Sequence, residues 1–223
     1  MKQHVIIVAG GKGLRFGAGL PKQFMLLKGM PVLMYSIKAF FNDCSTCNII
    51  VCLPDEHLTL WKDLCKKHEF KIAHKLIVGG ETRFQSVKNG LDAIADSEGL
   101  VAIHDGVRPL ISTSLISKLF REAHPHHSAV PIIDVTDSIR KVDKIDSIQA
   151  DRSQFKAVQT PQCFNLKKLK QAYQQNHNTF FTDDASVFES MGNKIHLVEG
   201  DKKNIKITTS EDLAIAEALI SLS

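Results

Sequence analysis

The sequence lacks the features that would place the chain in a membrane or outside the cell. No apolar run approaches the roughly 20 residues that a membrane-spanning helix needs. The segment after Met1 leads into an expected strand without the pattern of a signal peptide. Cysteines number only five and are scattered along the chain, which suits a reducing cytoplasm better than a disulfide framework. We therefore expect a cytoplasmic protein without a membrane segment.

The chain also has little excess charge. Its formal net charge is +4, which is too small to indicate a nucleic-acid partner but would not repel a small anionic substrate. A hydrophobic content of 43% is ordinary for a globular protein, and 223 residues can bury one ample core. Neither an internal repeat nor a low-complexity linker divides the chain. We expect a single domain over residues 1–223.

Short β-rich segments alternate with helical patterns over the first part of the chain. The expected strands are Val5–Ala9, Asn48–Leu53, Lys75–Val78, Leu100–His104 and Ala129–Ile133. The expected helices between them are Val32–Phe41, His57–His68, Phe84–Ala95 and Ser114–Ala123. Strands that alternate with helices are typical of an α/β fold, so the pattern predicts a mostly parallel sheet with helices on both faces.

One segment, Asp137–Asp151, breaks this alternation. Its apolar residues alternate with charged ones, which predicts a polar two-stranded hairpin with a turn near Asp143–Asp146. An isolated hairpin is only marginally stable in water. We therefore expect it to pack on another surface, and a second subunit is the surface that we favour.

A glycine-rich loop follows the first expected strand. The stretch VAGGKGLRFGAGLPKQF, from Val8 to Phe24, combines close glycines with the cations Arg15 and Lys22, a composition typical of a phosphate site. It fits neither common glycine pattern. The third glycine of a dinucleotide fingerprint is replaced by Phe16, and Lys22 is not followed by the Ser or Thr of a phosphate-binding P-loop.

Two further loops should meet this one. In an open α/β sheet, ligands bind at the carboxyl ends of the strands. The loops Val78–Gly90 and His104–Pro109 also begin at the carboxyl ends of expected strands. Glycines let backbone N–H groups approach phosphate oxygens, and arginines add charge-assisted hydrogen bonds. An Asp in such a place commonly binds a divalent cation. Together the three loops predict a site for a phosphorylated ligand with a cation.

The chain resembles a known family through six stretches, which span about residues 5 to 215 in that family's order and spacing. They are AGGKGLRFG…LPKQF, GGETRFQSVKNGL, HDGVRP, DRSQFKAVQTPQCF, TDDASVFESMG and VEGDKKNIKITTSEDL. The chain is similar to cytidylyltransferases that act on sugar-alcohol phosphates, most closely the 2-C-methyl-D-erythritol 4-phosphate cytidylyltransferases of isoprenoid-precursor synthesis. This implies an enzyme that uses CTP and a divalent metal, usually Mg²⁺, to make a CDP-alcohol and pyrophosphate. It also implies a Rossmann-like three-layer sheet and a homodimer joined by a β-arm, at about residues 133–155.

The resemblance also implies roles for individual residues. The catalytic cations would be Arg15, Lys22 and Lys206. The nucleotide would be bound by Ala9, Gly10, Gly11, Gly13, Gly80, Arg83, Ser86, Asp105 and Gly106, with Asp105 also serving the metal. The sugar-alcohol phosphate would be bound by Arg108, Ser138, Arg152, Thr160 and Thr182. The chain departs mildly from the family at Gly10, at Gly106-Val107 and at Ser138, where Ser keeps the hydroxyl of the usual Thr.

Three other functions remain open at this point. A ribitol 5-phosphate cytidylyltransferase shares the glycine loop, PKQF and NIKIT, although Asp151-Arg152 eight residues before Thr160 favours the methylerythritol enzyme. A dinucleotide-dependent oxidoreductase is disfavoured by the displaced third glycine and the cations of the loop. A non-catalytic nucleotide-binding module would be expected to have lost one of the cations, and all are present.

Overall fold

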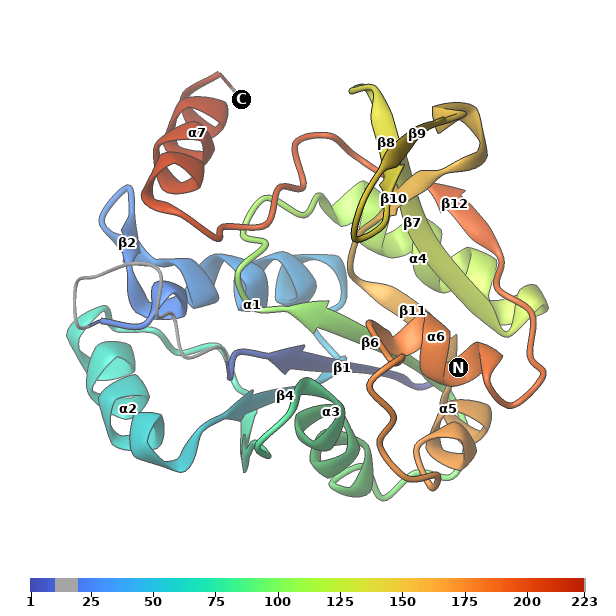
Figure 1. Cartoon of the computed structure of the whole chain (residues 1–223). Helices are drawn as coiled ribbons and strands as arrows, with labels where there is room; N and C mark the ends of the chain where they lie inside the picture. The colour runs from blue at the N-terminus through green and yellow to red at the C-terminus, as the bar shows by residue number, and fades with distance from the viewer. Residues whose placement is uncertain (11–19, 223) are drawn as a thin grey trace.

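The computed structural model describes residues 1–10 and 20–222 (Figure 1). Within them, one eight-stranded sheet has the order β10-β7-β11-β6-β1-β4-β5, with β12 paired to β7. Its strands are β1 (Gln3–Val8), β4 (Asn48–Leu53), β5 (Lys75–Val78), β6 (Leu100–Asp105), β7 (Ser128–Asp134), β10 (Lys156–Val158), β11 (Gln162–Asn165) and β12 (Leu197–Glu199). The α/β class is thus confirmed, whereas the single domain over 1–223 stays a prediction.

The sheet is mixed, but most of its strands run in one direction. Strands β5, β4, β1 and β6 are parallel neighbours. Strand β11 then runs antiparallel between β6 and β7, and β10 pairs antiparallel with β7. Strand β12 pairs parallel with β7, so only β10 and β11 run against the other strands and the expectation of a mostly parallel sheet is confirmed. The five expected strands are all present, whereas β10, β11 and β12 had not been predicted.

Helices cover both faces of the sheet. One face carries α1 (Val32–Asp43), α2 (Leu58–Lys67) and α4 (Thr113–His126), and the other carries α3 (Arg83–Asp92), α5 (Leu166–Ala172) and α6 (Asp184–Glu189). Strand β1 shows why both faces are covered, because Val5 and Ile7 belong to one buried cluster while Ile6 and Val8 belong to the other. Successive side chains of a strand point to opposite faces, so the expected three layers are confirmed.

Helix α3 lies unusually close to the sheet. A Cβ atom at Gly90 would lie 2.8 Å from Cγ2 of Ile6 on β1 and 3.1 Å from Sγ of Cys52 on β4. Any larger residue would therefore force either these side chains or the helix to shift. The first turn of the same helix lies beside the carboxyl ends of the strands, where the binding site is expected.

Two smaller units complete the chain around the sheet. A short hairpin of β2 (Leu26–Leu27) and β3 (Met30–Pro31) follows the 3-10 helix η1 (Lys22–Phe24), and α7 (Ser210–Ser221) packs beside it. The other 3-10 helices are η2 (Asp55–His57) and η3 (Arg152–Gln154). None of the described helices is both long and apolar enough to cross a membrane.

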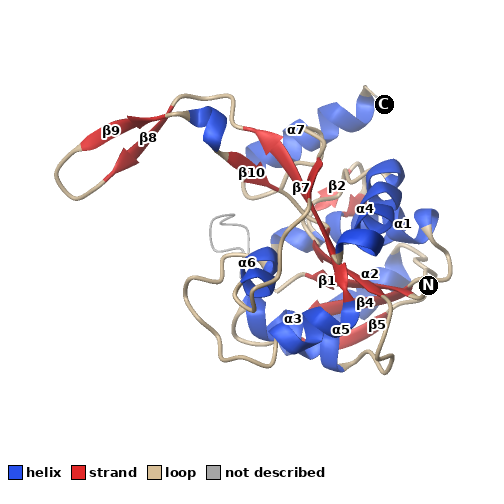
Figure 2. Cartoon of the chain, turned by 90° about the vertical axis from the view of Figure 1, so that its right-hand side faces the viewer, coloured by secondary structure: helices blue, strands red, loops and turns tan. Residues whose placement is uncertain are grey.

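The expected arm is present as a hairpin that projects from the body of the molecule (Figure 2). Strands β8 (Ile139–Val142) and β9 (Ser147–Ala150) pair antiparallel, and the amide of Asp143 donates to the carbonyl of Asp146 at 3.0 Å. The predicted hairpin and its turn are confirmed. Its apolar side chains face solvent in the single chain, since Val142, Ile145 and Ile148 are 72%, 97% and 62% exposed.

Candidate active site

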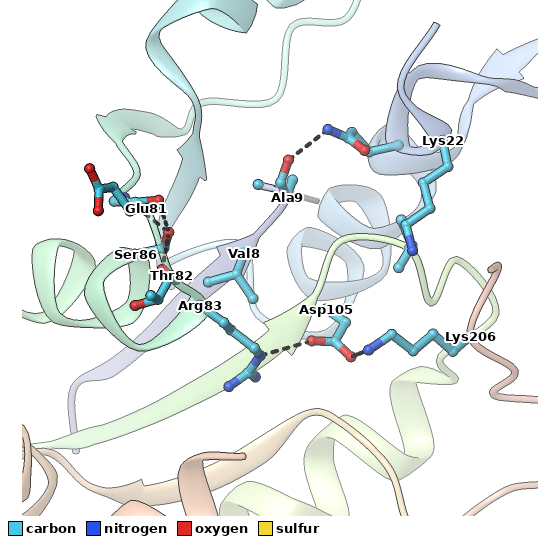
Figure 3. Close-up of a pocket in the computed structure, with 13 residues that line it drawn as sticks. Val8, Ala9, Lys22, Glu81, Thr82, Arg83, Ser86, Asp105 and Lys206 are labelled. Carbon is cyan, nitrogen blue, oxygen red and sulfur yellow. Dashed lines mark hydrogen bonds and ion pairs between the residues drawn. The ribbon is translucent and has the colours of Figure 1, made fainter. Parts of the chain in front are cut away.

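A pocket of about 190 Å³ lies at the carboxyl edge of the parallel strands (Figure 3). Val8 is the register partner of Asp105, so the loops after β1 and β6 begin at the same edge. The loop after β5 joins them, because the amide of Gly79 donates to the carbonyl of Leu53 at the end of β4. The pocket is lined by Val8, Ala9, Gly10, Lys22, Gln23, Gly80, Glu81, Thr82, Arg83, Ser86, Asp105, Val107 and Lys206.

Eight of the residues predicted for the site meet in this pocket. They are Ala9, Gly10, Lys22, Gly80, Arg83, Ser86, Asp105 and Lys206. Figure 3 shows that they come from segments far apart in the sequence, which the sheet brings to one edge. Three further predicted residues, Gly11, Gly13 and Arg15, lie outside the described part of the chain.

Asp105 is the centre of a cluster of cations. Its carboxylate lies 2.9 Å from Nζ of Lys206, 3.3 Å from Nε of Arg83 and 3.6 Å from Nε of Arg108. Burial alone would raise the pKa of Asp105, but the charges of Arg83 and Lys206 outweigh it and hold this pKa well below its usual range. Positive charge therefore exceeds negative charge around this carboxylate, which suits an anionic ligand.

The backbone of Asp105 is fixed by a buried chain of hydrogen bonds. Its amide donates to Oγ1 of Thr160 at 3.0 Å, and that hydroxyl lies 3.2 Å from Nδ1 of His104. The other ring nitrogen of His104 lies 3.1 Å from the carbonyl of Arg108. One tautomer satisfies all three contacts: Thr160 donates to Nδ1, and Nε2–H donates to the carbonyl. These hydrogen bonds thus fix the position of Asp105, around which the cations cluster.

His104 should make folding pH-dependent. It is fully buried, and burial lowers its pKa from 6.5 to about 4, despite the opposing charge of Asp105. The unfolded chain therefore binds a proton first as the pH falls. Above about pH 6.5 His104 is neutral in both states and does not lower the free energy of unfolding. Between about pH 6.5 and pH 4 its protonation in the unfolded chain lowers the free energy of unfolding by on the order of 3 kcal/mol.

Denaturant unfolding at several pH values measures this effect. His104→Gln should make the loss of stability between pH 6.5 and 4 shallower. His124→Gln, on the exposed surface of α4, controls for the removal of a histidine as such. An unchanged slope in the His104 variant would show that its charge is not what destabilises the acid form.

Gln23 is a lining residue that sequence reasoning missed. It is fully buried beside Lys22 in η1, and its Nε2 donates to the carbonyl of Ala9 at 2.7 Å. Phe24, the next residue, stacks on Trp61 with ring centroids 6.0 Å apart. Gln23 thus ties the segment that carries Lys22 to the end of β1. Nothing in its residue type distinguishes it from a surface glutamine in the sequence.

The start of α3 forms the opposite wall of the pocket. The amide of Gly80 donates to Oγ of Ser86 at 3.0 Å, and that hydroxyl lies 3.0 Å from the carbonyl of Thr82. A Cβ atom at Gly80 would lie 2.1 Å from Cγ of Gln85, so this turn requires glycine. Thr82 caps the helix by accepting a hydrogen bond from the amide of Gln85. The wall therefore presents backbone polar groups in fixed positions.

The remaining predicted residues do not line the pocket. Thr160 and Arg108 lie behind Asp105, and Gly106 packs where a Cβ atom would lie 2.9 Å from Cδ1 of Leu33. Thr182 is exposed just before α6. Ser138 and Arg152 are exposed at the base of the arm, where the guanidinium of Arg152 donates to the carbonyl of Thr136. The arm thus carries two of its predicted substrate contacts outside the pocket of its own chain.

A second group of potential metal ligands lies on the far side of α4. Among the described residues, Glu122, His126 and His196 bring one donor atom each within 4.8 Å of one another. The two imidazole rings are stacked, with centroids 3.8 Å apart and planes 12° apart. Their in-plane lone pairs therefore lie in two nearly parallel, separate planes and do not converge on one point. At least one ring would have to turn before both could bind the same ion.

Comparison with known proteins agrees with the geometry of the pocket. The family model of 2-C-methyl-D-erythritol 4-phosphate cytidylyltransferase matches residues 3–221. The protein of that name from Bacteroides thetaiotaomicron is 50% identical over 220 residues, which cover 99% of this chain and 100% of the relative. The one from Halalkalibacterium halodurans is 37% identical over 224 residues, with 99% and 98% covered.

Solved structures show the same fold. The 4-diphosphocytidyl-2C-methyl-D-erythritol synthase of Anaerococcus prevotii aligns with a TM-score of 0.84 and 26% identity, over 99% of this chain and 96% of that one. The 2-C-methyl-D-erythritol 4-phosphate cytidylyltransferase of Thermus thermophilus aligns with a TM-score of 0.80 and 28% identity, over 99% and 100%. With a family model that spans nearly all of it, this chain belongs to the 2-C-methyl-D-erythritol 4-phosphate cytidylyltransferases.

Proposed function

We propose that this pocket transfers the cytidylyl group of CTP to 2-C-methyl-D-erythritol 4-phosphate. The products are 4-diphosphocytidyl-2-C-methyl-D-erythritol and pyrophosphate, in the non-mevalonate synthesis of isoprenoid precursors in the cytoplasm. The observation that carries the proposal is the cation cluster at Asp105, in a pocket with glycines on the walls that face it. Such a pocket matches a triphosphate joined to a nucleoside.

The pocket suggests how CTP lies in it. The triphosphate would follow Ala9 and Gly10 into the loop, with Lys22 and Lys206 on its oxygens. The cytosine would lie against the wall of Gly80 and Ser86, where backbone groups can distinguish an exocyclic amine from a carbonyl. Gly11, Gly13 and Arg15 complete the triphosphate site in this proposal.

The reaction needs no covalent intermediate. An oxygen of the acceptor phosphate attacks the α-phosphorus of CTP in line, a P–O bond forms, and the bond to pyrophosphate breaks on the opposite side. The acceptor is already an anion at neutral pH, so no general base is required. The barrier comes from repulsion between anions and from charge that gathers around phosphorus. Catalysis therefore rests on positioning and on fixed cations, here Lys22, Lys206 and Arg15.

The residues present also fit a divalent cation such as Mg²⁺. Mg²⁺ in nucleotide enzymes is commonly held by one or two carboxylates together with substrate phosphates. Asp105 supplies a carboxylate in the pocket, and its partners Arg83 and Lys206 can turn to phosphate oxygens once a cation takes their place. The bound ion would neutralise charge on the triphosphate.

The acceptor site needs the arm. Ser138 and Arg152 are the residues that we assign to the acceptor phosphate, together with Arg108, Thr160 and Thr182. Since the first two lie on the projecting hairpin, we propose that two chains form a homodimer in which each arm reaches the pocket of the other. The exposed apolar side chains of the arm would then be covered by the partner.

A pyrophosphate-release assay tests this function and separates the alternatives. With Mg²⁺ and CTP, 2-C-methyl-D-erythritol 4-phosphate should give rapid release, and ribitol 5-phosphate little. The reverse order would make the protein a ribitol 5-phosphate cytidylyltransferase. CTP binding without release for either acceptor would indicate a non-catalytic nucleotide module, and tight binding of a nicotinamide cofactor would support the oxidoreductase alternative.

A further inference from the structure

Arg83 is held between two carboxylates. It is the first residue of α3, and its Nε lies 3.3 Å from Oδ1 of Asp105 in the pocket. Its Nη2 lies 2.7 Å from Oδ2 of Asp184, the first residue of α6. The shorter of the two ion pairs is therefore made with a residue that does not line the pocket.

Asp184 is built into the core. Its side chain is fully buried, and its second oxygen accepts a hydrogen bond of 2.6 Å from the hydroxyl of Tyr173. The ring of Tyr173 stacks on Phe84, the residue after Arg83, with centroids 4.7 Å apart. A buried carboxylate is very costly without a charged partner, so Arg83 and Asp184 constrain each other strongly.

The carboxylates of Asp105 and Asp184 differ in whether a ligand in the pocket can reach them. Asp105 lies in the pocket, where a metal ion or phosphate can change its partners. Asp184 does not line the pocket, so a bound ligand does not compete directly for its contacts with Arg83 and Tyr173. Arg83 is thus anchored at one end while its other edge, next to Asp105, faces the ligand.

We propose that Asp184, supported by Tyr173, is a positioning residue that fixes Arg83 for binding of the nucleotide. This inference rests on the proposed function of the pocket. It assigns Asp184 to the affinity for CTP and not to the chemical step or to the acceptor. Loss of its charge leaves Arg83 free to turn toward Asp105 or solvent. Arg83 must then be ordered when the nucleotide binds, which lowers the affinity for CTP.

Asp184→Asn is the main test, and Asp183→Asn is its matched control. Asp183 caps α6 and accepts a hydrogen bond from Gln162, whereas the carboxylates paired with Arg83 are those of Asp105 and Asp184; asparagine caps helices equally well. In Asp184→Asn, we expect the KM for CTP to rise about tenfold to a hundredfold, as for a lost hydrogen bond to a charged group. The kcat and the KM for the acceptor should change little, and the control should behave as wild type.

A double-mutant cycle distinguishes positioning from general damage. In an Arg83→Ala background, Asp184→Asn should no longer change the CTP constant, because the residue that it positions is gone. Calorimetry with CTP alone gives the same comparison without turnover. If Asp184→Asn does not fold, Tyr173→Phe keeps the ion pair and should raise the CTP constant by a smaller factor.

Several outcomes would overturn the inference. A folded Asp184→Asn protein with unchanged CTP affinity would do so, as would equal losses for CTP and the acceptor. An undiminished effect in the Arg83→Ala background, or unchanged CTP affinity in Tyr173→Phe when Asp184→Asn does not fold, would also count against it. Failure of the wild-type chain to bind CTP would instead reject the function on which the inference rests.

Discussion

Replacing Lys206 with alanine should lower kcat by about 10²–10³, the loss typical of removing one preorganised group that stabilises the transition state. Its ammonium lies 2.9 Å from the Asp105 carboxylate, in the pocket that Lys22 also lines. The segment that carries it is fixed, because the amide of Ile207 donates to the carbonyl of Val107 at 2.9 Å. A cation held in this way needs little reorganisation when charge develops on phosphorus. Steady-state kinetics with both substrates would measure the loss.

The control for this experiment lies three residues away. Lys203 is exposed in the same loop and does not line the pocket, so Lys203→Ala should keep wild-type turnover. Lys206→Arg, which keeps the charge, should recover part of the activity. Combined with Lys22→Ala, the Lys206 effect should not simply add, since in the proposed mechanism both cations act on one phosphorus centre. Turnover near that of wild type in Lys206→Ala would remove Lys206 from the catalytic group.

Mixing two inactive variants should restore activity if each site is shared between subunits. Lys22→Ala damages the pocket and Arg152→Ala damages the arm. In a mixed dimer, one site then carries both lesions and the other carries neither. With random exchange of equal amounts, half the dimers are mixed and half of their sites are intact, so about a quarter of wild-type activity should return. If pocket and arm of one chain made one site, every mixed site would keep a lesion.

This complementation needs proof that subunits exchange. Differently tagged variants can be captured through one tag and probed for the other. A mixture of Lys22→Ala with Lys206→Ala is the matched negative control, because both residues line the same pocket and no intact site can form. Confirmed exchange without recovery in the first mixture would contradict the shared site.

Much of the fold could be predicted because the central strands have strong patterns. Strands β4 and β5 were predicted residue for residue, and β1 and β6 to within a few residues. Strands β10, β11 and β12, each three or four residues long, were missed. Segments that short carry little periodicity of their own. Each of the three pairs with β7, and β11 also pairs with β6, so these tertiary pairings decide that they form strands.

The candidate site was predictable to the extent that its residues follow strands. Glycines, Arg83 and Asp105 come directly after strands or begin a helix, so topology alone brings them together. Gln23 and Asp184 act through tertiary contacts with Ala9 and Arg83, at separations of 14 and 101 residues. No local pattern encodes such a contact. The assignments of Ser138 and Arg152 to the acceptor, and of Asp105 to a metal, remain predictions.

The close approach of α3 to the sheet at Gly90 has a consequence for the width of the nucleotide pocket. The first turn of α3 carries Arg83 and Ser86, whereas Gly90 lies seven residues after Arg83, about 10 Å along the helix. A single methyl group there would press on Ile6 in the core of the sheet, so that either this side chain or the helix would have to shift. The distance between the first turn of α3 and the strands that form the rest of the pocket thus depends on a glycine that lies outside the pocket.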